Sequence, residues 1–103
     1  LYFGLGSSTV DALNLERLSI IVRLMEVRPE IKMEVIGFAD KTGNSAVNRD
    51  LSRKRAEAVL DILVTKYNIS KDRLFINFFG DTKLLSSTPN AAVNRRVDFQ
   101  IAE

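Results

Sequence analysis

The stretch that decides the fold runs from residue 40 to residue 58 and reads DKTGNSAVNRDLSRKRAEA. An apolar run at residues 35–39 precedes it and predicts the end of a strand. Gly43 and Asn44 predict a turn, and a helical pattern follows to about residue 67. Asp40 therefore lies where a strand ends and a crossover to a helix begins. Ligands of open α/β sheets tend to bind at this carboxyl end of the strands.

One charged residue lies on the apolar side of this predicted helix. Arg55 is four residues after Leu51 and four residues before Val59, so it shares their side of the helix. The other charged residues of the central turns fall on the opposite, polar side, namely Arg53, Lys54, Glu57 and Asp61. A guanidinium on an apolar face either reaches the edge of the helix or meets an anion.

Two interpretations of Asp40 and Arg55 stay open from the residues alone. In the structural interpretation, Asp40 pairs with Arg55 or accepts hydrogen bonds from the turn, and no ligand is involved. In the functional interpretation the two form a clamp, in which Asp40 accepts a ligand ammonium and Arg55 holds a ligand carboxylate through its two-pronged fork. Such a clamp would suit a zwitterion such as an amino-acid head group.

Four motifs then point to a family. Residues 48–59 resemble the pattern N-x-x-L-S-x-x-R-A-x-x-V, and residues 37–40 resemble G-[YHF]-[TA]-D. Residues 94–97 resemble N-R-R-V. Phe3 with Ser7 and Ser8 resembles an opening strand and its turn. Together they cover essentially the whole chain. The sequence is similar to the OmpA C-terminal-like domain, a family of domains that bind peptidoglycan.

The resemblance implies a ligand and a role for three residues. In that family an aspartate and an arginine hold the diaminopimelate residue of the peptide stem, and they match Asp40 and Arg55 here. The aspartate contacts the side-chain amine and the arginine contacts the carboxylate. Asn48, the first fixed position of the signature, is implied to be part of the pocket or of its support, the alternative being a solvated residue in the first helical turn. This sequence differs from that family at two positions, because Ala39 replaces a frequent threonine and Asp81 replaces the usual glutamate.

Three further residues are expected near the ligand. Thr42 and Gly43 lie on the turn, whose backbone N–H groups could share the ligand carboxylate with Arg55. Gly43 could instead be present only because the turn needs a positive φ. Arg95 and Arg96 are consecutive beside the last predicted strand and point to opposite faces, so we expect Arg95 to be a secondary contact and Arg96 to be solvated.

The predicted fold is a single α/β domain over residues 1–103, with the order β-α-β-α-β-β. Strands are expected at residues 1–5, 31–39, 74–79 and 96–102, and helices at residues 10–28 and from the turn to about residue 67. This gives a two-layer sandwich with a mixed four-stranded sheet and two helices on one face. We expect Ser7, Ser8 or Thr9 to cap the first helix. The wide apolar arc of that helix predicts that the sheet and a neighbour cover most of it. Residues 82–94 are expected to form a loop with room for one helical turn.

Composition excludes several kinds of site. The chain contains neither cysteine nor histidine, which removes Cys/His zinc sites, thiol nucleophiles and Ser-His-Asp triads. We therefore expect no enzyme, no metal and no cofactor. A net charge of +2 is too small to predict nucleic-acid binding. No signal peptide or membrane-spanning run is visible, so we expect a piece of a larger outer-membrane protein whose anchoring segment lies outside this sequence.

The predicted function is non-covalent anchoring of the outer membrane to the cell wall, through the diaminopimelate residue of the stem peptide, in the periplasm of a Gram-negative cell. One alternative is a basic-helix module for an anionic polymer or nucleic acid, built on four basic residues of the second helix with two more beside the last strand, namely Arg49, Arg53, Lys54, Arg55, Arg95 and Arg96. Acidic residues interrupt that face of the helix. The other alternative is a structural or self-association domain, and the oligomeric state stays open.

Overall fold

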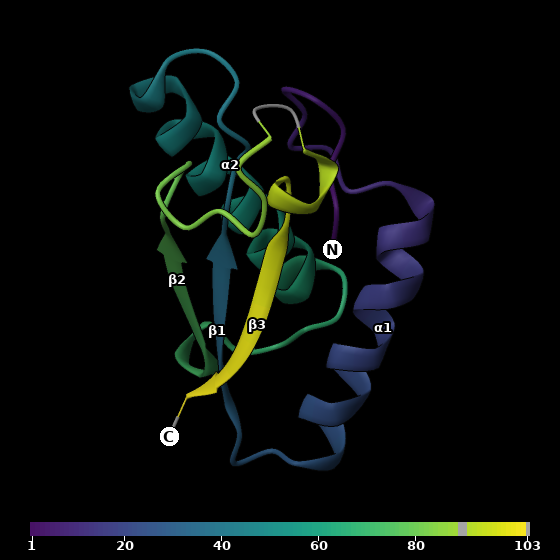
Figure 1. The fold of residues 1–103 in the computed structure, drawn as a ribbon. Coiled ribbons are helices and arrows are strands. Elements are labelled where there is room, and N and C mark those ends of the chain that lie inside the picture. The colour runs from purple at the N-terminus through teal and green to yellow at the C-terminus, as the bar shows by residue number, and fades with distance from the viewer. Residues whose placement is uncertain (89–90, 103) are drawn as a thin grey trace.

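The computed structural model describes residues 1–88 and 91–102. Its elements are α1 (Ala12–Val27), β1 (Lys32–Gly37), α2 (Ser45–Thr65), β2 (Leu74–Phe78) and β3 (Val97–Ala102), with short 3-10 turns at Lys71–Arg73 and Ala92–Asn94. The strand order is β2-β1-β3, in which β2 runs parallel and β3 antiparallel to β1. Figure 1 shows α2 behind this sheet and α1 beside it. Neither helix is long and apolar enough to cross a membrane.

The predicted α/β fold with two helices and a mixed sheet is confirmed, but among the described residues the sheet has three strands rather than four. The strand expected at residues 1–5 is present only as a bridge between Tyr2 and Arg96. Backbone hydrogen bonds extend this pairing by one residue on each side, between Leu1 and Val97 and from the N–H of Phe3 to the carbonyl of Arg95. The segment then turns away from β3, because the N–H of Ser7 donates to the carbonyl of Gly4 and Gly6 has a φ of 65°. The carbonyls of Gly4 and Ser7 accept from Arg55 rather than from a neighbouring strand.

Both helices begin where a side chain caps their first N–H groups. Asp11 accepts from the backbone of Asn14 and starts α1, so the predicted cap at Ser7, Ser8 or Thr9 is wrong. Asn44 accepts from the N–H groups of the second and third residues of α2. The predicted loop at residues 82–94 does contain one 3-10 turn, and its Pro89 and Asn90 lie outside the described residues.

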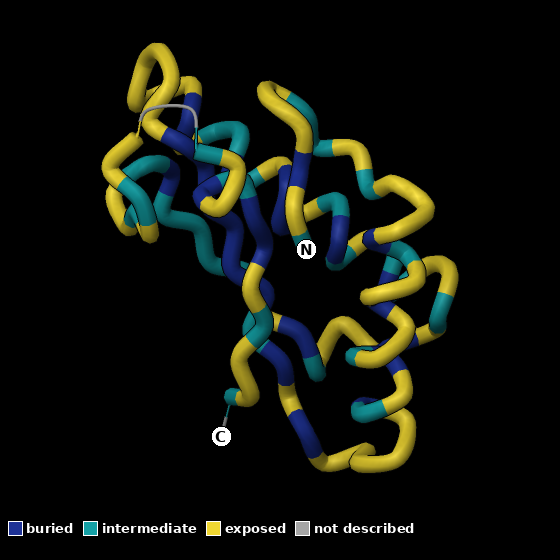
Figure 2. Tube along the Cα trace, turned by 45° about the vertical axis from the view of Figure 1, so that its right-hand side comes forward, coloured by how far each residue is buried: buried dark blue, intermediate teal, exposed yellow. Residues whose placement is uncertain are grey.

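One core joins both helices to one side of the sheet. It includes Leu18 and Met25 of α1, Met33 and Val35 of β1, and Val59 and Leu63 of α2. Figure 2 shows the buried residues gathered between these elements, whereas the outer side of α1 is exposed. The expectation that a neighbour covers most of α1 is therefore wrong for its outer side.

Gly37 brings α2 directly onto β1. A Cβ atom at Gly37 would lie 1.9 Å from the carbonyl oxygen of Ser52, so only glycine allows this approach. The Ser52 hydroxyl donates to the carbonyl of Arg49 and accepts from the N–H of Gly80. This contact fixes α2 against the end of β1 and the loop after β2. The loops that follow β1 and β2 and the N-terminal segment meet at this same end of the sheet (Figure 1).

Candidate functional site

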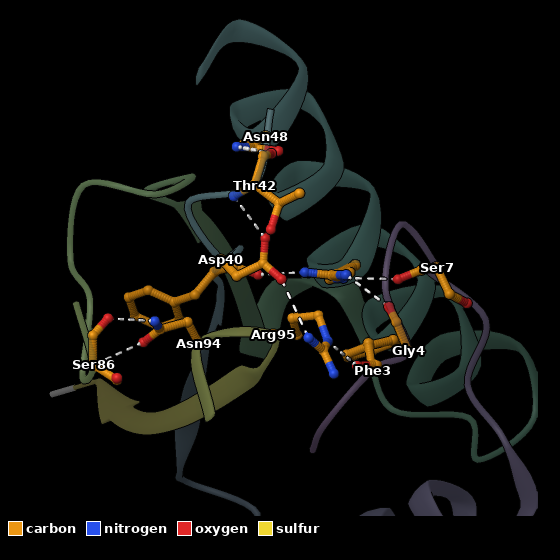
Figure 3. Close-up of polar contacts among 11 residues, drawn as sticks. Phe3, Gly4, Ser7, Asp40, Thr42, Asn48, Ser86, Asn94 and Arg95 are labelled. Atoms are coloured by element: carbon orange, nitrogen blue, oxygen red, sulfur yellow. Dashed lines mark hydrogen bonds and ion pairs between the residues drawn. The ribbon is translucent and has the colours of Figure 1, made fainter. Parts of the chain in front are cut away.

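Asp40 is a buried carboxylate just beyond the end of β1. It is 4% exposed, and its Oδ1 accepts from the backbone N–H of Thr42 at 3.0 Å. Its Oδ2 forms an ion pair with Nη1 of Arg95 at 3.2 Å (Figure 3). Burial raises the pKa of Asp40, but the hydrogen bonds from Thr42 and Arg95 outweigh it and leave that pKa below its ordinary value. Asp40 is therefore ionised at neutral pH.

Arg55 is fully buried and is held by backbone carbonyls. Its Nε donates to the oxygen of Ser7 at 2.8 Å, its Nη1 to that of Phe38 at 3.0 Å, and its Nη2 to that of Gly4 at 3.1 Å. Its guanidinium carbon also lies 5.4 Å from the ring centroid of Phe3. Arg55 thus ties the N-terminal segment to the end of β1.

Burial lowers the pKa of Arg55 to about 10, with Asp40 raising it and Arg95 lowering it further. The guanidinium is therefore still protonated at neutral pH. Of the two contacts in the structural interpretation, the hydrogen bond from the turn to Asp40 is present, but the ion pair of Asp40 is with Arg95 and not with Arg55. A guanidinium carries five N–H donors, so the three carbonyls do not exhaust those of Arg55.

A cavity of about 350 Å³ lies between α2, the end of β1 and the N-terminal segment. Its lining residues are Leu5, Gly6, Asp40, Thr42, Val47, Asn48, Asp50, Leu51, Lys54 and Arg55. Its buried members are Asp40, Asn48 and Arg55, whereas the polar side chains of Thr42 and Lys54 are exposed. Leu5 and Val47 are exposed and form an apolar rim.

Asn48 and Thr42 form part of the cavity wall and support each other. The Nδ2 of Asn48 donates to the carbonyl of Thr42 at 2.8 Å and to Oδ2 of Asp81 at 3.2 Å. The hydroxyl of Ser45 donates to the same Asp81 oxygen at 2.9 Å. Asn48 is 5% exposed, so the alternative of a solvated residue in the first helical turn is wrong.

The structure does not bring Gly43 or Arg95 to the cavity wall. Gly43 has a φ of 77° and is absent from the lining, which agrees with a turn that needs positive φ. The first N–H groups of α2 are already bound by Asn44. Arg95 reaches the site through its ion pair with Asp40 and donates from Nε to the carbonyl of Phe3 at 2.9 Å.

The residues on either side of Arg95 are buried in different surroundings. Asn94 closes the preceding loop, because its amide accepts from the N–H of Leu85 and exchanges hydrogen bonds with the backbone of Ser86 (Figure 3). Arg96 was expected to be solvated, and this is wrong. It is 6% exposed, donates from Nε to Asp98, and stacks with its guanidinium carbon 3.8 Å from the ring centroid of Phe38.

Sequence reasoning missed six residues of the cavity wall, which are Leu5, Gly6, Val47, Asp50, Leu51 and Lys54. A signal existed for the four that belong to α2. Residues 47, 50, 51 and 54 lie three or four apart, so helical periodicity places them on one side of α2. Leu5 and Gly6 carry no such signal, because only the folded chain brings the N-terminal segment to α2.

Comparison with known proteins agrees with this arrangement. The sequence model of the OmpA family matches residues 2–97. The crystal structure of the peptidoglycan-associated lipoprotein from Burkholderia pseudomallei has a TM-score of 0.89 and 25% identity, covering 99% of this chain and 88% of that one. The chain therefore belongs to the OmpA family.

Curated relatives are considerably longer than this chain. Outer membrane protein 41 of Porphyromonas gingivalis is 34% identical over 80 residues, which are 78% of this chain and 20% of that protein. The peptidoglycan-binding protein ArfA of Mycobacterium tuberculosis is 28% identical over 102 residues, which are 96% of this chain and 31% of that protein. The chain thus spans a fifth to a third of the length of these two relatives.

Proposed function

We propose that this chain binds peptidoglycan non-covalently through the diaminopimelate residue of the stem peptide and anchors the outer membrane to the cell wall from the periplasm. The observation that carries the proposal is that a buried carboxylate and a buried guanidinium, those of Asp40 and Arg55, line the same cavity. The names of two similar proteins, a peptidoglycan-binding protein and a peptidoglycan-associated lipoprotein, support peptidoglycan as the polymer.

The free end of diaminopimelate carries an ammonium and a carboxylate on one carbon. Asp40 accepts the ammonium, since its ionised carboxylate lines the cavity beside the groups of Thr42 and Arg95 that donate to it. Arg55 donates its remaining N–H groups to the ligand carboxylate. In a site shielded from water, each such charge-assisted hydrogen bond contributes about 1.5–3 kcal/mol before the entropy cost of binding.

The rim of the cavity fits the remainder of the ligand. Leu5, Val47 and Leu51 present apolar surface to the methylene chain that separates the two ends of diaminopimelate. The exposed ion pair between Lys54 and Asp50, at 3.2 Å, faces the peptide beyond that chain. The buried polar groups, the apolar side chains and the exposed ion pair of the cavity thus match, in that order, the charged end of diaminopimelate, its methylene chain and the peptide beyond it.

The test is an NMR titration of the isotope-labelled chain with a diaminopimelate-containing stem peptide and with a lysine-containing one. Lysine keeps the amine but lacks the carboxylate, so it removes the partner of Arg55 without changing the protein. We expect saturable shifts around Asp40, Asn48 and Arg55, and binding of the lysine peptide weaker by about tenfold to a hundredfold. Equal binding of both peptides would refute the role of Arg55, and no binding of either would refute the proposal.

Asp40→Asn tests the other half of the clamp, because it keeps the shape and removes the charge that meets the ammonium. It should weaken both peptides, by about 2–5 kcal/mol if the site is desolvated in the complex. Asp61→Asn is the matched control, since it removes the same charge from an exposed position of α2 that does not line the cavity. Equal effects of the two substitutions would mean that general electrostatics, rather than the buried site, controls binding.

The alternative of an anionic polymer has less support. Two of the basic residues of α2 are engaged by acidic neighbours on the same helix, with Arg53 paired to both Asp50 and Glu57 and Lys54 paired to Asp50. This intrahelical pairing leaves little uncompensated positive charge for a polyanion. A steep loss of affinity with salt that is equal for both peptides would favour this alternative.

A further inference from the structure

The loop after β2 reaches the wall of the cavity through Asp81. Oδ2 of Asp81 accepts from the hydroxyl of Ser45 at 2.9 Å and from Nδ2 of Asn48 at 3.2 Å. Asp81 is half-buried and is not one of the residues that line the cavity. Its effect on a bound ligand must therefore pass through a residue that does line the cavity, and of these two partners only Asn48 does.

Gly80 fixes the place of this loop relative to α2 and β1. It has a φ of 59°, its N–H donates to the hydroxyl of Ser52 at 2.9 Å, and its carbonyl accepts from the N–H of Ala39 at 2.8 Å. Because both backbone groups of Gly80 are bound, Asp81 follows from a defined position. By contrast, the turn at residues 41–44 is exposed. Asp81 is therefore the firmer of the two supports on either side of the Asn48 amide.

The hydrogen bonds of Asn48 decide which end of its amide faces the cavity. Nδ2 carries two N–H donors, and both are used, one by the carbonyl of Thr42 (Figure 3) and one by the carboxylate of Asp81. The reversed amide would place Oδ1 against the same two acceptors and would lose both hydrogen bonds. Oδ1 is consequently held on the side away from Asp81.

This orientation leaves Oδ1 of Asn48 as an open acceptor. Within the described residues, the two hydrogen bonds from Nδ2 are the only ones that this side chain makes. In the same part of the chain, the only side-chain polar atom that is both fully buried and unpaired is Nη1 of Arg96, so Oδ1 of Asn48 is accessible. Asn48 lines the cavity, and its exposure is only 5%, so this access is from the cavity. Asp40 and Asn48 bind the N–H and the carbonyl of Thr42, which ties both acceptors to one short turn.

We propose that Asp81 is a positioning residue, which holds the amide of Asn48 so that its Oδ1 accepts a hydrogen bond from the ligand ammonium beside Asp40. The identity of the ligand rests on the proposed function. An ammonium carries three N–H donors, so it binds Asp40 and Asn48 at the same time. Asp40 supplies the opposite charge, and the fixed oxygen of Asn48 supplies a direction, which together favour an amine over a group without N–H donors.

The first test uses the chain without peptide, so that its outcome is independent of the proposed function. NMR relaxation of the side-chain amide nitrogen of Asn48 measures how firmly the amide is held. We expect this group to be as rigid as the backbone of α2 in the natural chain and mobile in Asp81→Ala. Thr82→Ala is the matched control, because it removes a hydrogen bond of the same loop, from the Thr82 hydroxyl to the carbonyl of Phe79, without touching Asn48. An amide that is mobile in the natural chain, or equally rigid in Asp81→Ala, would overturn the proposal.

The second test compares two stem peptides that differ only in the amine at the free end of one residue. One contains diaminopimelate, and the other contains aminopimelate, which keeps the carboxylate at that end and lacks the ammonium. Asp81→Ala should weaken binding of the first peptide by about fivefold to tenfold and of the second by less than about twofold. Asp81→Asn should recover most of the affinity, because its amide oxygen still accepts from Asn48.

Each other outcome of this comparison has a separate meaning. A purely structural role of Asp81 would weaken both peptides equally, because a distorted cavity is distorted for either ligand, and this result would overturn the proposal while the proposed function stands. Unchanged binding of both peptides by Asp81→Ala would overturn it as well. If neither peptide binds the natural chain, the proposed function fails, and the role of Asn48 toward an ammonium fails with it.

Discussion

The two ends of the sheet each contain an arginine that binds three backbone carbonyls. At the end where β1 finishes, Arg55 donates to Gly4, Ser7 and Phe38. At the opposite end, Arg73 donates to Ile31 at 3.0 Å, Met25 at 2.8 Å and Arg28 at 2.9 Å. Both side chains therefore hold a distant segment against the sheet, and their hydrogen bonds to the backbone are equal in number and kind.

Their surroundings differ. Arg55 is fully buried and lines a cavity together with the carboxylate of Asp40. Arg73 is half-buried, binds the carbonyls at the end of α1 and has no part in that cavity. A guanidinium that binds backbone carbonyls therefore does not by itself indicate a ligand site. What makes Arg55 a candidate ligand residue is the charged partner and the open volume beside it.

The largest expected effect is that of Arg55→Ala, which removes the structural role together with the charge. It leaves three carbonyls without donors and opens space in the core, so the free energy of unfolding should fall by about 3–5 kcal/mol. Urea denaturation followed by circular dichroism measures it. A loss below about 1 kcal/mol would mean that water replaces this guanidinium easily, and the contrast with Arg73 would then disappear.

Gly37→Ala should destabilise the same end of the sheet, through a clash with the backbone of α2. Its Cβ atom would overlap the carbonyl of Ser52, so α2 must move away from β1, and we expect a loss of about 2–3 kcal/mol or more in the same unfolding measurement. Gly43→Ala is the control. It has open space but positive φ, and only about 1 kcal/mol of backbone strain is expected. Equal losses of unfolding free energy for Gly37→Ala and Gly43→Ala would show that α2 can move away from β1 without destabilising the fold.

Arg73→Ala should lower the free energy of unfolding by about 1–2 kcal/mol, because water can reach its half-buried carbonyls after the side chain is removed. Stem-peptide binding measured by the same titration should not change. A decrease in affinity comparable to that of Asp40→Asn would mean that the two ends of the sheet are coupled, and the comparison between the arginines would need revision.

The smallest effect is the acid dependence of Asp40. Because its pKa is lowered in the folded state, its stabilising contribution is fully present above the ordinary carboxyl pKa and is lost as pH falls through the folded-state value. The difference in unfolding free energy between the natural chain and Asp40→Asn, about 1 kcal/mol at neutral pH, should therefore shrink below about pH 4. A difference that grows on acidification would contradict the direction of this shift.

Much of the fold follows from local patterns. Alternating and helical periodicities predicted both helices and the three strands of the sheet, with ends within a few residues of those observed. The strand predicted at residues 1–5 pairs only around the bridge at Tyr2, because the chain turns away from β3 after Phe3 and the carbonyls of Gly4 and Ser7 accept from Arg55. Periodicity carries no information about where such a turn falls.

Short-range spacing was enough to place a carboxylate, Asp40, after a central strand and a guanidinium, Arg55, on the inner side of the next helix. The pairing of Asp40 with Arg95, 55 residues away, and the hydrogen bond from Arg55 to Ser7, 48 residues away, could be found only in the folded chain. The tertiary structure also decided that Leu5 and Gly6 complete the cavity. These contacts join segments that meet only after the core has formed, and no local pattern specifies their geometry.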